Sequence, residues 1–504
     1  MQETQTRFSL AAKVLILRQM LWGASFYGVY VLLTRFFLDE LNYSEADTLM
    51  MLGAFGAVGP VFSVVGGFAA DRFIGAFRAV YIGYIFYTLG FLLLGLGAST
   101  LNIPMSIFAI ALIGYSRGLS ATCPTVLLGN SFGNDKREVF QQALTINYSI
   151  NNLGSFLAHY LFPFFIAFWG YQGNFYISTL LMAANLGLFY FFRRPLTDVG
   201  NDLDQRPISL KTWLGFIVMS FAMLGLVYWI FANLDQGKYL MYALGSLAIG
   251  YFIYEIFRAS PAYRWKMSAV VVFMLILVVF YFYYGQLMTS MNMYAINLMG
   301  GELFGFIPLK PESNAAFNPL WCFVMGAPVM LSYAWLERKG IYLSIPTKFA
   351  AAFFFSAIAF LLLGVSTGQL GADGKIAPEW IVFVHMFQAV GELIVGALAA
   401  GFIFDMVPRH LSAFAVGLRA VALSLSGIFA AVISTRIALP KDIVLTPEVV
   451  ESVYAGFFYN LGFLALVMVV VTLGLAKVIK IMVARGEALE QEQQDAVEIK
   501  IATA

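Results

Sequence analysis

Three charged residues lie deep inside segments that are otherwise apolar enough to cross a membrane. Arg117 and Glu392 each fall about twelve residues into their predicted spans, and Arg419 lies several residues into the following one. A charge at this depth costs at least about 2.5 to 3.5 kcal/mol, so each side chain should face a wet cavity or a partner rather than lipid. One carboxylate stands against two guanidinium groups, so the cavity should favour a solute with a carboxylate, phosphate or similar group.

Other polar residues inside predicted spans add to the expected lining of this cavity. Gln286 and Asn152 should face the bundle interior, as polar side chains in membrane helices normally do. His159 and His385 carry groups that change protonation near physiological pH, but we interpret each as a packed or capping residue rather than a coupling site. Arg18 lies about two turns inside the first span, where its stem should snorkel to the cytoplasmic interface.

Long apolar segments must position these residues, so the chain is expected to be an all-α integral membrane protein. Of its 504 residues, 61% are hydrophobic and only 12% are charged. A spanning helix needs about 20 mainly apolar residues, and about fourteen segments meet this requirement. No cleavable signal peptide is evident, because the first apolar segment is long enough to span and should stay in the mature chain.

A short charged stretch with glycines separates the second and third apolar segments. Gly67 and Gly75 allow close helix approach and a tight reversal of the chain. Asp71, Arg72 and Arg78 can form a charge cluster that locks neighbouring helices in one state and releases them in another. We therefore predict that these five residues form a gating loop in a protein that changes conformation.

The apolar segments divide into two six-helix halves separated by two extra helices. We predict an N-terminal bundle at 1–192, a linker with a two-helix insert at 193–265, a C-terminal bundle at 266–484 and a cytoplasmic tail at 485–504. A degenerate copy of the charged loop at 337–340 occupies the matching position under a six-helix repeat.

Basic residues are concentrated in the connections on one side of the predicted membrane. With the amino terminus inside, about twenty fall on the cytoplasmic side and about six outside, which is the asymmetry of short cytoplasmic loops. We expect both termini to be cytoplasmic in a multi-pass cell-membrane protein, and the short loops favour a bacterial inner membrane. A net charge of +2 without a concentrated basic face argues against a nucleic-acid partner. Membrane lipid is the expected surrounding, and a monomer suffices.

Sulfur and the remaining titratable residues suggest no metal or cofactor. Cys123 and Cys322 both fall in predicted spans, so neither a disulfide framework nor a metal site is expected. Asp405, Arg409 and His410 should form a gate or interface network at an inner helix end.

Several stretches, in this order, resemble a known family. The charged loop is similar to the connection between helices 2 and 3 of the major facilitator superfamily, which implies that fold: two six-helix bundles, here with a two-helix insert. Further motifs resemble those of the proton-coupled oligopeptide transporter (POT, PTR2) family, whose bacterial members carry such an insert. The matching stretches are 25–28, 67–78, 152–155, 304–308, 318–320, 338–340, 346–349 and 391–393.

The chain departs from this family in its first helix. The family motif E-x-x-E-R-F carries groups implicated in proton coupling and substrate binding, but Gln19, Trp22 and Gly23 stand at those positions. A further family arginine falls on Tyr30, and the family's helix 4 lysine on Cys123. The usual carboxylate-binding and proton-coupling groups are therefore largely missing.

The resemblance also implies roles for residues that are present. It places Tyr27 and Tyr30 in the substrate cavity and makes Glu392 a proton carrier or the anchor for a substrate amine. The alternative for Glu392 is a structural salt bridge, for which Arg419 is the candidate partner. For Arg117 and Arg419, substrate contact and a static ion pair both stay open.

An enzyme is not expected, because the sequence has no phosphate loop of the G-x-x-x-x-G-K-[ST] type and no H-E-x-x-H motif. We predict a secondary transporter that moves a small polar solute by alternating access. The resemblance implies di- or tripeptides, or related amino-acid derivatives, with proton symport through Glu392. The alternatives are a facilitator without proton coupling, a carrier of another organic anion or drug-like compound, and a membrane sensor that does not transport.

Overall fold

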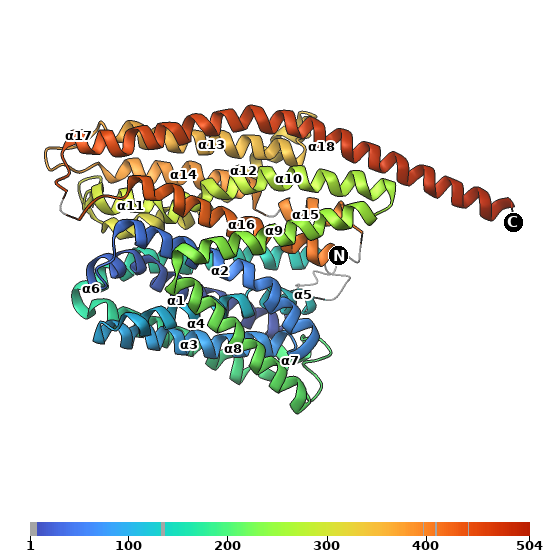
Figure 1. Cartoon of the computed structure of the whole chain (residues 1–504), viewed down its shortest axis with the longest axis horizontal. Coiled ribbons are helices and arrows are strands. Elements are labelled where there is room, and N and C mark those ends of the chain that lie inside the picture. Colours follow the sequence, from blue (N-terminus) through green and yellow to red (C-terminus); the bar gives the residue numbers. More distant parts are fainter. Residues whose placement is uncertain (1–7, 133–136, 397, 409–410, 442, 504) are drawn as a thin grey trace, which may run out of the picture.

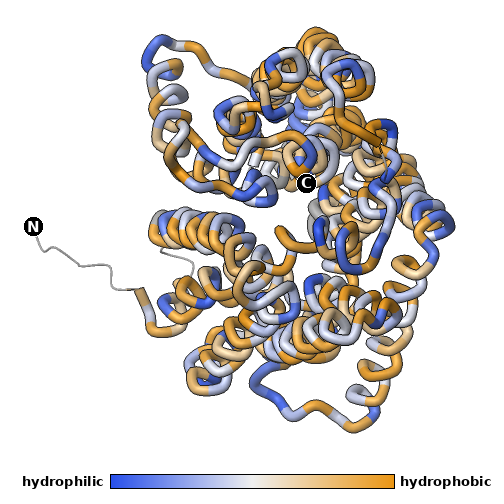
Figure 2. The backbone as a smooth tube through the Cα atoms, turned by 90° about the vertical axis from the view of Figure 1, so that its left-hand side faces the viewer, coloured by the Kyte–Doolittle hydropathy of each residue, from blue (hydrophilic) through white to orange (hydrophobic). Residues whose placement is uncertain are grey.

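The computed structural model describes residues 8–132, 137–396, 398–408, 411–441 and 443–503. Its helices run along one long axis in two layers (Figure 1). In this described part, thirteen helical segments are long and apolar enough to cross a membrane, and one of them has 53 residues. Figure 2 shows hydrophobic residues around the helices and hydrophilic residues gathered in the connections, as expected for a membrane protein.

The 53-residue segment contains two spans rather than one. Its helix breaks at Gly170, which has a φ of 61° that a side chain would disfavour. Asn151 before the break bonds to Gln19, and Asn185 after it bonds to the backbone of Arg18, so the chain must reverse between them. The expected spans at 140–169 and 175–192 are thus both present, and the predicted all-α architecture of about fourteen spans is confirmed.

Serine residues begin several of the long helices. Each side chain accepts a hydrogen bond from a backbone N–H of the first turn, which would otherwise lack a partner. These caps are Ser9, Ser44, Ser209, Ser260 and Ser344. A polar residue before an apolar run therefore fixes where each of these helices starts.

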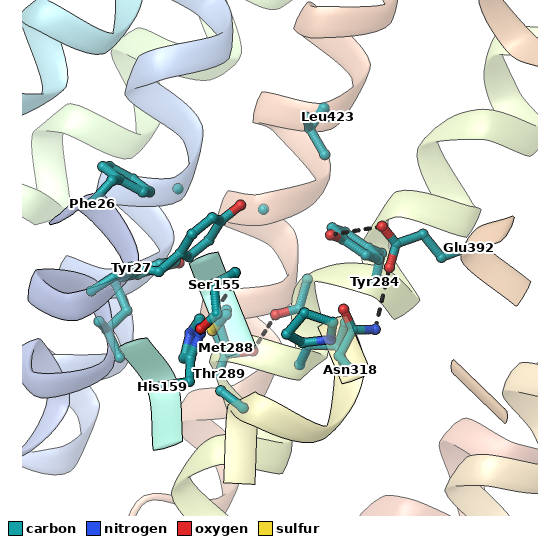
Figure 3. Close-up of a pocket in the computed structure, with 18 of the residues that line it drawn as sticks. Phe26, Tyr27, Ser155, His159, Tyr284, Met288, Thr289, Asn318, Glu392 and Leu423 are labelled. Carbon is teal, nitrogen blue, oxygen red and sulfur yellow. Dashed lines mark hydrogen bonds between the residues drawn. The ribbon is translucent and has the colours of Figure 1, made fainter. Parts of the chain in front are cut away.

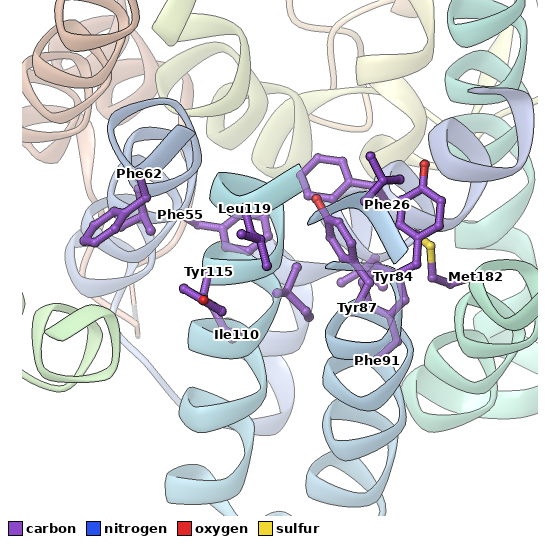
Figure 4. Packing of buried hydrophobic residues seen from close by; sticks show 14 of the residues in the cluster. Phe26, Phe55, Phe62, Tyr84, Tyr87, Phe91, Ile110, Tyr115, Leu119 and Met182 are labelled. Carbon is purple, nitrogen blue, oxygen red and sulfur yellow. The ribbon is translucent and has the colours of Figure 1, made fainter. Parts of the chain in front are cut away.

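The first helices pack around one apolar core. Figure 4 shows its aromatic centre, where Phe26, Tyr84 and Tyr87 lie among other buried rings. The elements are α1 Leu10–Arg35, η1 Phe36–Glu40, α2 Glu45–Ala69, η2 Ala70–Ile74, α3 Ala76–Thr100, α4 Ile103–Ser120, α5 Cys123–Asn130 and α6 Arg137–Phe191. Apart from Ile428, the buried members of this core come from residues 11–241.

A second core is formed by the later helices, with buried members from residues 252–479. A short antiparallel hairpin of β1 Glu302–Leu303 and β2 Ile307–Pro308, with two residues in each strand, packs against it through Leu303. The helical elements are α10 Pro261–Gly285, η3 Gln286–Met288, α11 Ser290–Leu298, η4 Pro311–Ala316, α12 Phe317–Arg338, α13 Ile345–Ser366, α14 Pro378–Val395, α15 Leu398–Asp405, α16 Ser412–Ser434, η6 Thr435–Ile437, α17 Pro447–Val450, η7 Glu451–Ala455 and α18 Gly456–Thr503.

The insert joins both cores instead of standing apart. After α7 Arg193–Asp198 come α8 Leu210–Ala232 and α9 Leu234–Arg258. Phe231 is buried in the first core and Phe252 in the second. The two-helix insert therefore bridges the two bundles. The exact domain limits remain a prediction.

The two ends of the molecule differ. The start of α1 and the end of α18 lie toward the same end of the long axis, which we call the termini end; the opposite end is the distal end (Figure 1). The predicted tail is not a separate segment, because α18 continues helically to Thr503. Lys266 at the start of α10 also pairs with Glu490 of α18.

Candidate functional site: a cavity between the two cores

A cavity of about 210 Å³ lies between the cores and is lined by residues from both. The first core contributes α1, α2, α4 and α6, and the second contributes α10, η3, η4, α12, α14 and α16. Of the predicted substrate-binding residues, the structure brings five to this cavity: Tyr27, Tyr30, Arg117, Asn152 and Glu392.

Glu392 provides the negative charge of the cavity. Its carboxylate accepts a hydrogen bond from Asn318 Nδ2 at 3.2 Å and from Tyr284 Oη at 3.5 Å (Figure 3). Tyr148 Oη of α6 donates from the first core at 3.4 Å, and the Cys322 thiol lies 3.6 Å away. No basic side chain in the described part of the chain is within 4 Å of this carboxylate. Glu392 thus has neutral donors around it and no counter-ion.

Arg117 provides the positive charge, and it comes from the other core. Its guanidinium carbon lies 5.0 Å above the centre of the Phe26 ring, a cation–π contact. Gly59 of α2 makes room for it, because a Cβ there would lie 2.5 Å from Arg117 Cδ. Within the residues that the structure places, Arg117 has no ion pair and no hydrogen bond to another side chain. Its charge is therefore available to a solute.

Two predicted cavity residues lie elsewhere. Gln286 is fully buried. Its Oε1 accepts hydrogen bonds from Ser290 at 2.5 Å and Ser434 at 2.9 Å, so its carbonyl links elements of the second core. Arg419 donates from Nη1 to the backbone oxygen of Gly396 at 3.1 Å, beyond the end of α14. Neither side chain lines the cavity.

The proposed salt bridge between Glu392 and Arg419 is absent among the residues described. The sequence showed how deep each charge lies, but whether two charges meet depends on how each helix is rotated about its axis.

The histidines are packed, which is one of the two roles expected for them, but they also line the cavity. His159 of α6 and His385 of α14 are each only 1% exposed, and both line the cavity. His159 Nδ1 bonds to the backbone oxygen of Ser155 at 2.8 Å, whereas its Nε2 and both ring nitrogens of His385 have no hydrogen-bond partner. They are thus not capping residues.

Arg18 does not snorkel to the interface as expected. It is 6% exposed and donates from Nη1 to Tyr84 Oη at 2.7 Å and from Nε to the Leu15 backbone oxygen at 3.3 Å. Its guanidinium also bonds to Gln19. The snorkelling prediction was wrong because hydroxyl, amide and carbonyl oxygens inside the bundle satisfy the guanidinium.

The charged loop holds the linker rather than forming the expected charge cluster. Gly75 has a φ of 91°, a value that favours glycine, and it starts α3. Arg78 Nη1 donates to the Leu203 backbone oxygen at 2.6 Å, and Nη2 donates to that of Arg206 at 2.8 Å. Asp71 and Arg72 are exposed, with no ion pair in the described part. The gating role of this loop, with Gly67, stays a prediction.

Two residues that matter locally were not predicted. Asp204 in the linker is 4% exposed and accepts from the backbone N–H groups of Phe77 and Arg78 at 3.0 and 3.2 Å. Asn318 binds Glu392 as described above. Asn318 stands inside one of the family-like stretches, so that motif was a usable signal, whereas nothing near Asp204 marks it as the cap of a distant helix.

Polar contacts join the two cores at the distal end. Arg35 Nε lies 2.7 Å from Glu312 Oε1, and Thr34 Oγ1 accepts from Asn292 Nδ2 at 2.9 Å. Glu45 accepts from Asn297 Nδ2 at 2.9 Å in the same region. The predicted network of Asp405, Arg409 and His410 at the other end includes two residues outside the described part of the chain.

Two helical cores around a central cavity, with half-buried charges of opposite sign contributed by different cores, define a membrane carrier. Solved structures agree with this fold over nearly the whole length. A bacterial homologue of the human drug peptide transporters PepT1 and PepT2 has a TM-score of 0.82 at 22% identity, covering 94% of this chain and 99% of that one. Tetrameric PepTSo2 gives 0.82 at 22%, covering 94% and 98%. The expected major facilitator fold is confirmed.

The sequence itself also matches a family. The model described as PTR2, POT family, matches residues 77–449, and the chain belongs to that family. Relatives include dipeptide and tripeptide permease B of Salmonella typhimurium, 28% identical over 446 residues that cover 88% of this chain and 90% of the relative. The protein of the same description from Shigella dysenteriae is 29% identical over 466 residues, 92% and 94% of the two chains.

Proposed function

We propose that this protein is a secondary transporter that carries di- and tripeptides across a cell membrane by alternating access, with proton symport. The observation that supports it most is the pair of uncompensated charges, Arg117 and Glu392, on facing cores of one cavity. A zwitterionic peptide carries a carboxylate at one end and an ammonium at the other, and so complements both. Membership of the POT family and the names of the permease relatives support the same substrate class.

Each end of the peptide has a defined partner in this proposal. The guanidinium of Arg117 holds the substrate carboxylate, since Arg can present two parallel donors to it. Glu392 holds the ammonium, while Asn318, Tyr148 and Tyr284 keep the carboxylate oriented. Because the two charges belong to different cores, a bound peptide draws the cores together. Substrate binding would thereby favour closure.

The distribution of Lys and Arg indicates how the protein is oriented in the membrane. We propose that the termini end faces the cytoplasm and the distal end the outside, because the loops of the termini end carry most of the Lys and Arg. The Arg35–Glu312 contact then closes the outer side. The cavity lies within one chain, so we propose the monomer as the transporting unit, although PepTSo2 is described as tetrameric.

The first prediction pairs a side-chain change with a substrate change. In proteoliposomes with an inward proton gradient, Glu392→Gln should raise the KM for dialanine at least about thirtyfold, the loss expected for one buried charge partner. N-acetyl-dialanine has no ammonium, so Glu392→Gln should change its uptake much less. Arg117→Gln should likewise raise the KM for dialanine. Dialanine amide has no carboxylate, so Arg117→Gln should change its uptake much less. Initial rates of labelled substrate measure all four combinations.

Arg419→Gln provides the comparison, because it removes the same chemistry from a position off the cavity. A loss with Arg419→Gln that matches the loss with Arg117→Gln would contradict the proposed carboxylate site. Equal losses of blocked and unblocked peptides in Glu392→Gln would contradict the ammonium site. Binding of peptide without uptake by the unmodified protein would favour a sensor.

A further inference from the structure

His159 and His385 bring two imidazoles into the same cavity from opposite cores. His159 lies on α6 of the first core, one turn after Ser155 (Figure 3), and His385 lies on α14, two turns before Glu392. Both side chains line the same cavity. Three of their four ring nitrogens are buried without a hydrogen-bond partner, which is unusual for groups that bond strongly to water.

The surroundings of the two rings are mostly neutral. The Tyr27 ring of α1 lies 5.2 Å from His159, and the Phe317 ring of α12 lies 6.3 Å from His385. The nearby η4 brings Glu312, which is already bonded to Arg35. The charged and titratable groups that share the cavity with the histidines are Arg117, Glu392, Tyr27, Tyr30, Tyr148, Tyr281 and Tyr284.

A coupled proton needs a carrier that stays free while peptide is bound. If Glu392 holds the substrate ammonium, it must be ionised at that moment and cannot also carry the proton. Arg117 keeps its proton at all relevant pH, and tyrosine releases its own only near pH 10 in water. On α1, Gln19 and Trp22 have no group that titrates. In the described lining of the cavity, this leaves the two imidazoles.

We propose that the His159–His385 pair carries the coupled proton, an inference that rests on the proposed peptide symport. When the distal side is open, one unpartnered ring nitrogen takes a proton from extracellular water. Two imidazolium ions in one closed pocket would repel each other, so the pair takes one proton. The proton crosses with the bound peptide and is released to cytoplasmic water once the termini side opens.

The test separates net transport from exchange. His159→Gln, His385→Gln and the double variant keep an amide that can bond to water but does not titrate. In proteoliposomes with a pH gradient, dialanine accumulation should fall at least about tenfold, to near the equilibrium level, while exchange of labelled for unlabelled dialanine should fall by no more than about threefold. A pH-sensitive dye inside the vesicles should show loss of peptide-driven acidification.

Gln388→Met serves as the matched control. Gln388 lies one turn from His385 on α14, is buried, contacts Met291 and does not line the cavity. It should keep full accumulation. Histidine variants that accumulate dialanine like the unmodified protein would overturn the proposal.

A second arm does not depend on folding of the histidine variants. Glu392→Gln with N-acetyl-dialanine, which does not need the carboxylate, should still accumulate the peptide against its gradient and acidify the vesicles. Loss of both in this arm would assign the proton to Glu392 and overturn the histidine proposal. If the unmodified protein takes up dialanine independently of the pH gradient, proton coupling fails while peptide transport stands. If it neither binds nor takes up peptide, the proposed function itself fails.

Discussion

At the scale of single residues, the charges inside the molecule divide into those with a partner and those without. Arg35 and Glu312 neutralise each other, and Arg78 is held by backbone oxygens of the linker. Among the described residues, Arg117 and Glu392 are half-buried and have no opposite charge within ion-pair distance, although withdrawing an uncompensated charge from water is costly. A charge kept at this cost is best explained by a ligand that supplies the partner.

Asp204 is the residue-scale feature with the clearest structural role. Its carboxylate receives backbone N–H groups from Phe77, Arg78 and Asn201, two of them in the first turn of α3. We predict that Asp204→Ala lowers stability by about 1–2 kcal/mol, because these donors lose their acceptor. The neighbour Asp202 is exposed, so Asp202→Ala should have no measurable effect. Thermal unfolding in detergent compares the two, and equal melting temperatures for both would exclude the capping role.

At the scale of elements, close helix crossings depend on glycine. A Cβ on Gly66 of α2 would lie 2.2 Å from the backbone oxygen of Gly118 of α4, and a Cβ on Gly118 would lie 2.6 Å from Phe62 Cβ. The absence of a side chain at each glycine thus allows α2 and α4 to pack closely. Because the obstacle at Gly66 is backbone, rotation of a side chain cannot relieve it.

Gly66→Ala should therefore destabilise the first core. We expect a loss of about 1–3 kcal/mol, the usual cost of overpacking. On α8, a Cβ at Gly225 would meet nothing within 4 Å, so Gly225→Ala should be neutral or stabilising through its better helix propensity. Melting temperatures of the two variants in the same detergent provide the measurement. A stable Gly66→Ala protein would show that α2 and α4 can separate at little cost.

Much of the element scale could be predicted from the sequence, and less of the site. Apolar length predicted about fourteen spans, and serine before an apolar run marks several helix starts. Depth along a span placed Arg117 and Glu392 correctly, but depth does not give rotation about the helix axis, so Gln286 and Arg419 were placed in the cavity when their side chains lie outside it. The free Nε2 of His159 and the two free ring nitrogens of His385 could not be foreseen, because the packing of other helices around them decides whether a partner is present.

At the scale of the whole molecule, the two cores are held in one relative position by contacts at the distal end. The Arg35–Glu312 pair is partly shielded from water, with side-chain exposures of 30% and 11%, so it should contribute more than a surface pair. The two cores must lose this contact when the distal side opens. We therefore expect this contact to favour the state in which the distal side is closed.

We predict that Glu312→Gln shifts the population toward the state open at the distal end. In a background with Cys123 and Cys322 replaced by serine, Thr289→Cys places a single thiol on the cavity wall. Adding Glu312→Gln should raise its labelling rate by an impermeant maleimide from the distal side by about tenfold, since losing roughly 1.4 kcal/mol of closing energy shifts a two-state equilibrium by that factor. Asp235→Asn, which breaks an ion pair with Lys238 inside α9, is the control. An unchanged or slower rate would argue against the pair as a lock.

The insert helix α9 is synthesised well before α16, one of the helices on which it packs. Apart from Ile428, the first core draws its buried side chains from residues 11–241, so it can pack before the second half leaves the ribosome. The side of α9 that faces α16 cannot, because Tyr242 stacks on Phe429 at 4.9 Å and Tyr251 meets Phe414 at 5.0 Å. At about 5–20 residues per second, those partners are synthesised roughly ten to forty seconds later. This aromatic face of α9 therefore gains its protein partner only after α16 has been synthesised, so the insert joins the second half of the chain late in assembly.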